Sequence, residues 1–313
     1  MDLALCGCGI SNNGGENLTK KRKIFKNRPL RSLAFLLSAL AFMMALPLFA
    51  SAAPSERAYD FPAGTVPVKV TLDGKDVLSG ESVIINSTTY VPLRSLSELV
   101  NAESISWNAK TATATVVKGE TTLYVRNGGF YLEAQGRYFY TPEGILNIND
   151  RLFVPIRPFA KVFCLDLIWN GDTRTVELYS TTNTLARGTS FYDSTDLYWL
   201  SRIIHAEAGG ESLAGKIAVG NVVLNRVRSK SYPNTVKGVI FDKNGGTQFS
   251  PVSFGTIYNT PSETSIIAAK ICLEGYSISD RILFFMNPKL ATNNWISKNR
   301  PFAFRIGNHD FYY

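Results

Sequence analysis

Histidine and cysteine are scarce in this 313-residue chain, which has two histidines and four cysteines. No His-Glu-x-x-His segment is present for a zinc protease, and no Gly-x-Ser-x-Gly segment for a serine hydrolase. The segment His205-Ala206-Glu207 is not followed by the Pro-Cys-x-x-Cys that a zinc deaminase requires. We therefore expect neither a metal site nor a cofactor.

The four cysteines do not form a framework that spacing alone can pair. Cys6 and Cys8 lie near the N-terminus, and Cys164 and Cys272 lie in regions of different composition. Cys272 falls on the apolar face of an expected helix, which predicts a small core residue. This placement argues against a cysteine peptidase that pairs Cys272 with His309.

The first 53 residues have the order of a secretory leader. A basic run over 20–31 precedes an apolar stretch over 33–49, and Ala50-Ser51-Ala52 supplies small residues for cleavage. We interpret residues 1–53 as a signal peptide, so the rest of the chain is expected outside the cytoplasm. The alternative is an uncleaved N-terminal membrane anchor, and no other membrane contact is expected.

The leader also explains most of the basic character. The whole chain has a net charge of +8, and residues 1–53 hold seven Lys or Arg against two acids. The remaining chain is only mildly basic, and we expect no nucleic-acid partner.

An internal repeat follows the leader. Residues 90–116 match residues 153–178 in an aromatic-Val-Pro-Leu/Ile-Arg opening and a later Trp-Asn pair, about 62 residues apart. Each copy predicts a strand ending in Val-Pro, a short helix and two strands joined by a turn. The pattern is similar to the copper amine oxidase N-terminal-like domain, over roughly 66–180. That segment contains no histidine, so we infer no copper site and interpret 54–182 as a stalk or wall-binding domain.

Residues 183–196 are rich in Ser, Thr and Gly and predict an exposed linker. Helical periodicity dominates from 197 to 313. The predicted fold class is α+β, with a mainly antiparallel repeat domain followed by a mostly helical domain. We expect the two domains to act separately, so that residues 195–313 retain activity alone.

Glu207 stands on an apolar helical stripe. Leu200, Ile203, Ile204 and Glu207 are spaced at i, i+3, i+4 and i+7, which places the carboxyl group on the apolar side. Burial should raise the pKa of this group toward neutrality, as a general acid requires. The glycines at 209–210 should then end the helix and leave an open edge beside the acid.

The alternative role for Glu207 is structural: a buried carboxylate paired with Arg226 or Arg228. Residues 215–227 predict a core helix that backs Glu207, because the segment is apolar nearly all round. A further helix is predicted after 260, with Thr260 as N-cap and Gly275 at its end.

Four ordered segments carry a second resemblance, at 207–227, 232–241, 248–252 and 306–312. They are similar to the SleB-type cell wall hydrolases, the spore cortex-lytic enzyme family, over roughly 198–313. The resemblance implies a lysozyme-like, mostly helical domain with Glu207 as the catalytic acid. By the same resemblance, the residues expected to bind substrate are Glu211, Gln248, Phe249, His309 and Tyr312.

The implied substrate and partner is peptidoglycan, cleaved between N-acetylmuramic acid and N-acetylglucosamine. No second acid suits a catalytic role as well as Glu207. Glu211 follows the two glycines that end the predicted helix, and Asp310 sits at a variable position of its motif. One acid suffices for lytic transglycosylation, which is the mechanism we expect. The alternative is a non-enzymatic wall-binding surface protein. We expect a secreted monomer in the cell wall or spore envelope.

Overall fold

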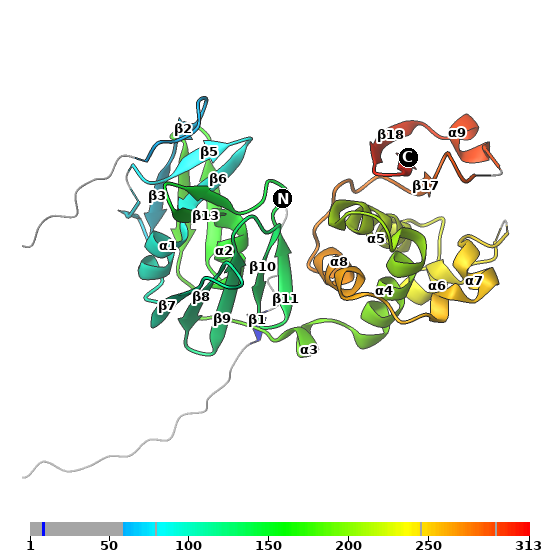
Figure 1. Cartoon of the computed structure of the whole chain (residues 1–313), viewed down its shortest axis with the longest axis horizontal. Coiled ribbons are helices and arrows are strands. Elements are labelled where there is room, and N and C mark those ends of the chain that lie inside the picture. The colour runs from blue at the N-terminus through cyan, green and yellow to red at the C-terminus, as the bar shows by residue number, and fades with distance from the viewer. Residues whose placement is uncertain (1–7, 10–58, 79, 245, 292) are drawn as a thin grey trace, which may run out of the picture. The chain divides into compact units, whose positions relative to one another are not determined.

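The structure, a computed structural model, describes residues 8–9, 59–78, 80–244, 246–291 and 293–313 (Figure 1). All of them belong to one compact unit. The signal peptide expected over 1–53 lies outside the described residues, apart from β1 (Cys8–Gly9), which pairs with β16 (Thr184–Leu185). Within the described ranges, no helix combines the length and the apolar character needed to cross a membrane.

The internal repeat folds as its sequence predicts. The first copy consists of a strand, a helix and a two-stranded hairpin: β6 (Thr88–Pro92), α1 (Leu93–Leu99), β7 (Ser104–Asn108) and β8 (Thr113–Lys118). The second copy repeats that order: β13 (Arg151–Pro155), α2 (Ile156–Val162), β14 (Asp166–Asn170) and β15 (Thr175–Tyr179). β6 and β13 pair with each other in antiparallel register, Val91 opposite Val154. The two copies therefore share one sheet at its centre.

The remaining strands of this repeat domain (residues 59–182) complete three sheets. Their bounds are β2 (Val66–Pro67), β3 (Lys69–Leu72), β4 (Lys75–Asp76), β5 (Val83–Ile85), β9 (Thr121–Arg126), β10 (Tyr131–Ala134), β11 (Arg137–Tyr140) and β12 (Leu146–Ile148). The strand orders are β11-β10-β9-β8-β7, β12-β13-β6-β5-β2 and β14-β15-β3-β4. All neighbours with a described register are antiparallel except β15 and β3, which run parallel.

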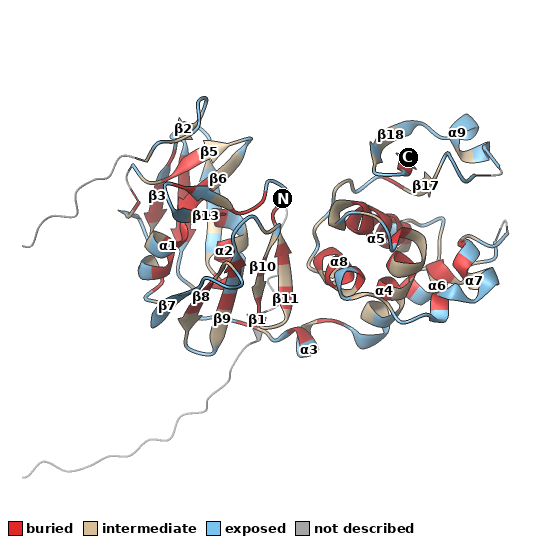
Figure 2. Ribbon diagram, viewed as in Figure 1, coloured by how far each residue is buried: buried red, intermediate tan, exposed pale blue. Residues whose placement is uncertain are grey.

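Alternation of side chains builds the core of the repeat domain. In β8 and β9, every second residue is buried, and Val116, Leu123 and Val125 are fully excluded from solvent. The helices α1 and α2 contribute Leu96 and Phe159 to the same cluster. Figure 2 shows buried residues along the strands of the repeat domain.

The segment expected as a linker, 183–196, is exposed at most of its residues, but it is not irregular throughout. It contains α3 (Gly188–Phe191) and the first residues of α4 (Ser194–Ala208). Leu185 and Tyr192 are both buried. Ser and Thr composition indicated an exposed segment, but the two apolar side chains determine where this segment packs.

The C-terminal domain (residues 197–313) is mainly helical and ends in a small sheet, which confirms the α+β class. Its helices after α4 are α5 (Leu213–Arg228), α6 (Val236–Ile240), α7 (Ser250–Phe254), the 3-10 helix η1 (Thr256–Tyr258), α8 (Glu263–Leu273) and α9 (Trp295–Asn299). The sheet has the order β17-β19-β18, with β17 (Phe284–Met286), β18 (Phe302–Ile306) and β19 (His309–Tyr312).

Helix α5 is the core helix that the sequence predicts, buried almost throughout from 215 to 226. Cys272 of α8 is a buried free thiol, as expected. Gly220 makes the close packing of α5 feasible, because a Cβ there would lie 2.6 Å from the Cys272 Sγ. The prediction that Thr260 is the N-cap of α8 was wrong. The N-cap is Ser262, whose side chain accepts a hydrogen bond from the Ser265 N–H. Cys164 is disulfide-bonded, which spacing did not indicate.

A buried ion pair connects β11 of the repeat domain to the residue that follows α8. Arg137 donates hydrogen bonds to Glu274 from Nε at 2.7 Å and from Nη2 at 2.6 Å, and both side chains are 5% exposed. The Tyr192 hydroxyl donates to the same carboxylate at 2.6 Å. Residues from the repeat domain, the segment 183–196 and the C-terminal domain therefore share one polar network.

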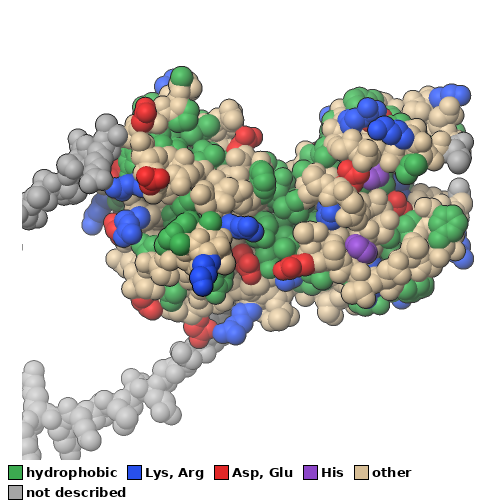
Figure 3. Space-filling model, viewed as in Figure 1, with side chains coloured by type: hydrophobic (Ala, Val, Ile, Leu, Met, Phe, Trp, Pro, Cys, Tyr) green, Lys and Arg blue, Asp and Glu red, His purple; other side chains and the backbone are tan. Residues whose placement is uncertain are grey.

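Charges of both signs are interspersed over the face of the molecule seen in Figure 3. This distribution agrees with a mildly basic chain beyond residue 53, because most of the net charge of +8 comes from the preceding segment.

Candidate active site

Helix α4 presents Glu207 on its apolar side, as the spacing predicts. Leu200, Ile203 and Ile204 on the same stripe have no exposed surface. The helix begins at an Asp193 N-cap, which accepts hydrogen bonds from two backbone N–H groups. It ends at Ala208, directly before the two glycines. Glu207 therefore occupies the last turn, where a buried helix face meets an open chain reversal.

Burial controls the charge of Glu207. Loss of hydration raises the pKa of its carboxyl group from 4.5 to about 7, and the nearby Arg226 cation opposes this rise. Within the described parts of the chain, the Glu207 carboxyl group has no hydrogen bond or ion pair. An unpaired carboxyl group with a pKa near neutrality has the properties of a proton donor.

The structural alternative for Glu207 required an ion pair with Arg226 or Arg228, and the structure has neither pair. Arg226 donates instead to the Leu283 carbonyl at 2.8 Å and to Gln248 Oε1 at 3.4 Å. Arg228 donates to Asn225 Oδ1. Arg226 therefore influences Glu207 through its charge without direct contact.

Arg226 lies at the site in a role other than the ion pair with Glu207 that was considered from the sequence. Its side chain is buried, and its guanidinium group lies 5.0 Å from the ring centre of Tyr232, 5.1 Å from Phe249 and 5.5 Å from Phe284. A cation held among three rings is stabilised by their negative faces. The signal in the sequence was an arginine close after the apolar run 217–224 of a predicted core helix.

The turn between α4 and α5 is fixed by Lys216. Its ammonium group donates to the carbonyl oxygens of Gly209, at 3.0 Å, and Glu211. The lysine is 4% exposed, and burial lowers its pKa. Both carbonyls belong to the turn that follows α4, so Lys216 ties this turn to α5. The position of Glu207 at the end of α4 thus depends on a residue in the next helix.

Glu211 contacts the hairpin between β18 and β19. Its carboxylate accepts hydrogen bonds from the Asn308 side chain at 3.0 Å and the Asn308 N–H at 3.3 Å. The side-chain bond is the largest cause of a lowered Glu211 pKa. The preceding Gly307 has φ +57°, and a Cβ there would overlap with Glu211 Oε2. Glu211 therefore needs a glycine at 307 to reach the hairpin.

The second acid considered from sequence, Asp310, is bound to Arg305. The Arg305 side chain donates to both Asp310 oxygens, one of them at 2.7 Å. This contact is the largest cause of a lowered Asp310 pKa. Asp310 is 6% exposed. A carboxylate engaged in this way is not available as a base for water.

Three of the five residues expected to bind substrate are buried: Phe249 at 2%, Tyr312 at 5% and His309 at 6% exposure. Phe249 packs toward Phe285, with ring centres 6.4 Å apart. Little of these three side chains is exposed for direct contact with a glycan, and their role in substrate binding stays a prediction. Burial is also the largest cause of a lowered His309 pKa.

Gln248 is the expected substrate-binding residue that remains partly exposed, together with Glu211. Its amide donates to the Asn244 carbonyl at 3.0 Å, and its oxygen accepts from Arg226. Gln248 thus links a surface loop to the buried cation near Glu207. Among the described residues, no group of three His, Cys, Asp or Glu side chains could hold a metal ion.

Comparison with known proteins agrees with both resemblances. Residues 210–312 match the Cell Wall Hydrolase family model. The chain carries a cell wall hydrolase domain. Residues 71–178 match the Copper amine oxidase N-terminal domain, so this hydrolase domain follows a copper amine oxidase N-terminal-like domain. Glu207 lies three residues before the matched range.

Curated relatives of the hydrolase domain include the spore cortex-lytic enzymes of Bacillus cereus and Bacillus subtilis. The first is 39% identical over 120 residues, covering 38% of this chain and 45% of that enzyme. The second is 38% identical over 120 residues, covering 38% of this chain and 38% of that enzyme. The chain therefore spans less than half the length of these curated relatives.

A solved structure was also matched, the catalytic domain of the germination-specific lytic transglycosylase SleB from Bacillus anthracis. It is 38% identical, with 39% of this chain and 97% of that chain covered and a TM-score of 0.36.

Proposed function

We propose that this protein cleaves the glycan strands of peptidoglycan by lytic transglycosylation, with Glu207 as its catalytic acid. The cell wall hydrolase domain and the spore cortex-lytic relatives support the substrate class. The observation that carries the mechanism is the unpaired Glu207 carboxyl group, whose pKa burial raises to about 7.

In the first step, Glu207 donates its proton to the oxygen that links N-acetylmuramic acid to N-acetylglucosamine. The bond from that oxygen to the anomeric carbon of N-acetylmuramic acid breaks as positive charge develops on this sugar. In the second step, the 6-hydroxyl of the same sugar attacks its anomeric carbon. Glu207 accepts the hydroxyl proton, so the carboxyl group returns to its starting state and no water is consumed.

The engaged state of the other two acids supports this intramolecular route. Glu211 is bound to Asn308, and Asp310 is bound to Arg305. Neither has a raised pKa, which a base for water near neutral pH would need. An internal hydroxyl avoids the entropy cost of recruiting a separate nucleophile.

The proposal includes the location. A chain that acts on peptidoglycan must work outside the cytoplasm, in the cell wall or the spore envelope, as a leader over 1–53 would allow. The repeat domain would then hold the hydrolase domain against the wall, and the protein would act as a monomer.

The first prediction is that Glu207→Gln abolishes the release of soluble fragments from a peptidoglycan suspension. The amide keeps the shape of the side chain but cannot donate a proton at neutral pH. In the wild-type digest, mass spectrometry should find 1,6-anhydro-N-acetylmuramic acid ends, one water lighter than hydrolytic ends. The controls Glu211→Gln and Asp310→Asn should give the same anhydro product at reduced rates.

Two outcomes would contradict the proposal. Reducing-end N-acetylmuramic acid would mean hydrolysis with a base other than Glu207. A wild-type protein that binds peptidoglycan without releasing fragments would favour the wall-binding alternative.

A further inference from the structure

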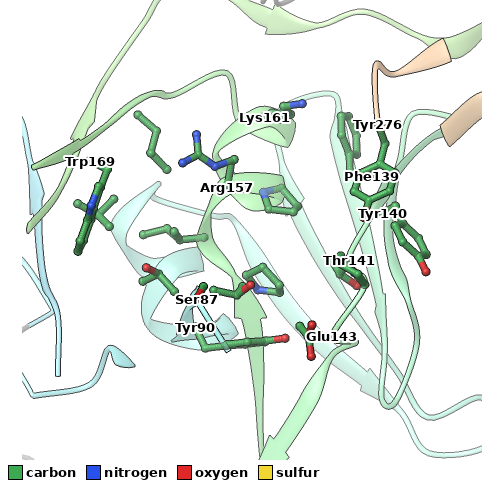
Figure 4. Close-up of a pocket in the computed structure, with 18 of the residues that line it drawn as sticks. Ser87, Tyr90, Phe139, Tyr140, Thr141, Glu143, Arg157, Lys161, Trp169 and Tyr276 are labelled. Carbon is green, nitrogen blue, oxygen red and sulfur yellow. The ribbon is translucent and has the colours of Figure 1, made fainter. Parts of the chain in front are cut away.

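A cavity of about 630 Å³ lies beside α2 of the repeat domain, remote in sequence from Glu207 and with neither Glu207 nor Arg226 in its wall. Figure 4 shows Trp169 on one side, Tyr140 and Tyr276 on the other, and Arg157 and Lys161 projecting from α2. The volume is in the range of sites that hold small ligands or short peptides. None of the chemistry proposed for Glu207 uses this cavity.

Two cations at this cavity have no partner of their own. Arg157 and Lys161 are four residues apart on α2 and both are exposed. Neither side chain forms a hydrogen bond or an ion pair with the described residues. Like charges at this spacing repel each other, so an anion placed between them would relieve the repulsion.

The internal repeat shows that this pair of cations belongs to the second copy alone. Arg157 corresponds to Arg94 of α1, but Lys161 corresponds to Glu98. The first copy therefore has an arginine and a glutamate at this spacing, and the second has two positive charges. The common fold does not require the change, because both positions are exposed.

Other groups around the cavity would suit a peptide. Thr141 is 1% exposed, and its hydroxyl group is buried without a hydrogen-bond partner. Such an orphan group is a site for a ligand's donor or acceptor. Trp169 is 42% exposed and offers an aromatic face. Glu143 supplies an acid, whose carboxylate accepts a single hydrogen bond among the described residues, from Asn86 at 3.2 Å.

We propose that this cavity binds the peptide stem of peptidoglycan by contacting the carboxylates of the stem. Arg157 and Lys161 pair with carboxylate groups, and Glu143 faces the amino group of the stem. The choice of this polymer rests on the proposed function, because the hydrolase domain and the cavity would then contact the same material. The repeat domain thereby selects strands that still carry peptides.

The test uses the full chain with Glu207→Gln, so that the ligand survives. Isothermal titration at low salt compares soluble disaccharide-peptides, the same disaccharides without peptides, and a glycerol phosphate polymer. The test variant is Arg157→Ala/Lys161→Ala. The matched control is Arg94→Ala/Glu98→Ala in the first repeat, and Thr141→Val removes only the buried hydroxyl.

We expect the double cation variant to bind disaccharide-peptides about tenfold more weakly, since each screened ion pair contributes up to about fivefold. The deficit should shrink at high salt. The first-repeat control should stay within about twofold of the parent. Thr141→Val should weaken binding of the peptide form alone.

Equal affinity of the double variant and its parent would overturn the proposal. A loss confined to the phosphate polymer would overturn it too and assign the cations to phosphate. These readouts are independent of cleavage. A wild-type chain that binds disaccharide-peptides at α2 but releases no fragments would defeat the proposed function and leave the cavity assignment standing.

Discussion

At Glu207, burial at the last turn of α4 raises the pKa to about 7, so the carboxyl group keeps its proton through the mildly acidic range. The neighbouring cation, Arg226, is occupied by a backbone carbonyl and an amide oxygen. The charge of Arg226 limits the rise in the Glu207 pKa, but the pKa still reaches about 7. The local packing therefore favours a donor over a fixed anion.

The raised pKa predicts a pH-dependent free energy of unfolding. The folded chain prefers neutral Glu207, so this group's contribution is full below pH 4.5 and is lost as pH rises through about 7. The shift corresponds to about 3 kcal/mol. Compared with wild type, Glu207→Gln should gain stability at pH 8 relative to pH 5, measured by urea unfolding. Exposed Glu98→Gln should show no such trend.

Gly307→Ala should destabilise the C-terminal domain by about 1–2 kcal/mol. The residue has φ +57°, and the new Cβ would displace the Glu211 carboxylate from Asn308. Chemical denaturation measures the change. Gly210→Ala is the control, because a Cβ there meets nothing within 4 Å. Equal losses in both variants would contradict the role of the Glu211 contact.

Sequence periodicity was sufficient to place Glu207, because a helical stripe depends on neighbours within two turns. It could not place Phe249, His309 or Tyr312, whose burial depends on packing between distant segments. The same limit applies to Glu211 and Asn308, which meet across 97 positions in the chain. Local patterns predict which side of its own helix a residue occupies, but not which distant loop covers it.

At the scale of elements, α4, α5 and α8 pack their apolar faces together, and the chain reverses between α4 and α5 directly after Glu207. Lys216 stabilises that reversal by donating to two backbone carbonyls. Among the described residues, Lys216 is the side chain that donates to both the Gly209 and the Glu211 carbonyl. The end of α4, and with it Glu207, therefore depends on α5.

Lys216→Met should lower the free energy of unfolding by about 1–3 kcal/mol, since it leaves two carbonyls without their donor. We also expect a reduced rate on peptidoglycan, because the last turn of α4 would lose its anchor. Thermal unfolding and fragment release are the two measurements. Exposed Lys230→Met should alter neither, and a comparable effect there would show that loss of positive charge alone was responsible.

The repeat was predictable at this scale, because both copies carry the same strand, helix and hairpin signals. The burial of Leu185 and Tyr192 was not predictable, because the Ser and Thr composition of 183–196 indicates an exposed segment. A single ring can determine how a segment packs when it reaches a buried partner. For Tyr192 that partner is Glu274, 82 residues away.

At the scale of the whole molecule, the Arg137–Glu274 pair joins the repeat domain to the hydrolase domain. Both side chains are 5% exposed, and Tyr192 completes the network. Lys270 adds a hydrogen bond from α8 to the Gly136 carbonyl at 3.0 Å. Independent activity of residues 195–313 remains a prediction. The fragment would lack these contacts with the repeat domain, so we expect it to be less stable than the full chain.

Glu274→Gln should therefore destabilise the full chain by about 3 kcal/mol, because a buried guanidinium group would lose its counter-charge. The matched control is Glu120→Gln, which removes an exposed pair with Arg187 at 3.7 Å and should have no measurable effect. Differential scanning calorimetry distinguishes the two. Similar melting temperatures for both variants would mean that the buried pair contributes no more than the surface one.

The partial burial of Glu207 has one more consequence, which concerns proton exchange with the solvent. Near neutral pH about half of the molecules carry a proton on this carboxyl group, since its pKa is about 7. A glycan strand lying over Glu207 would exclude the remaining water and raise that pKa further. Binding would then draw protons from the buffer, so affinity for the intact wall should fall as the surroundings become alkaline, before any bond is broken.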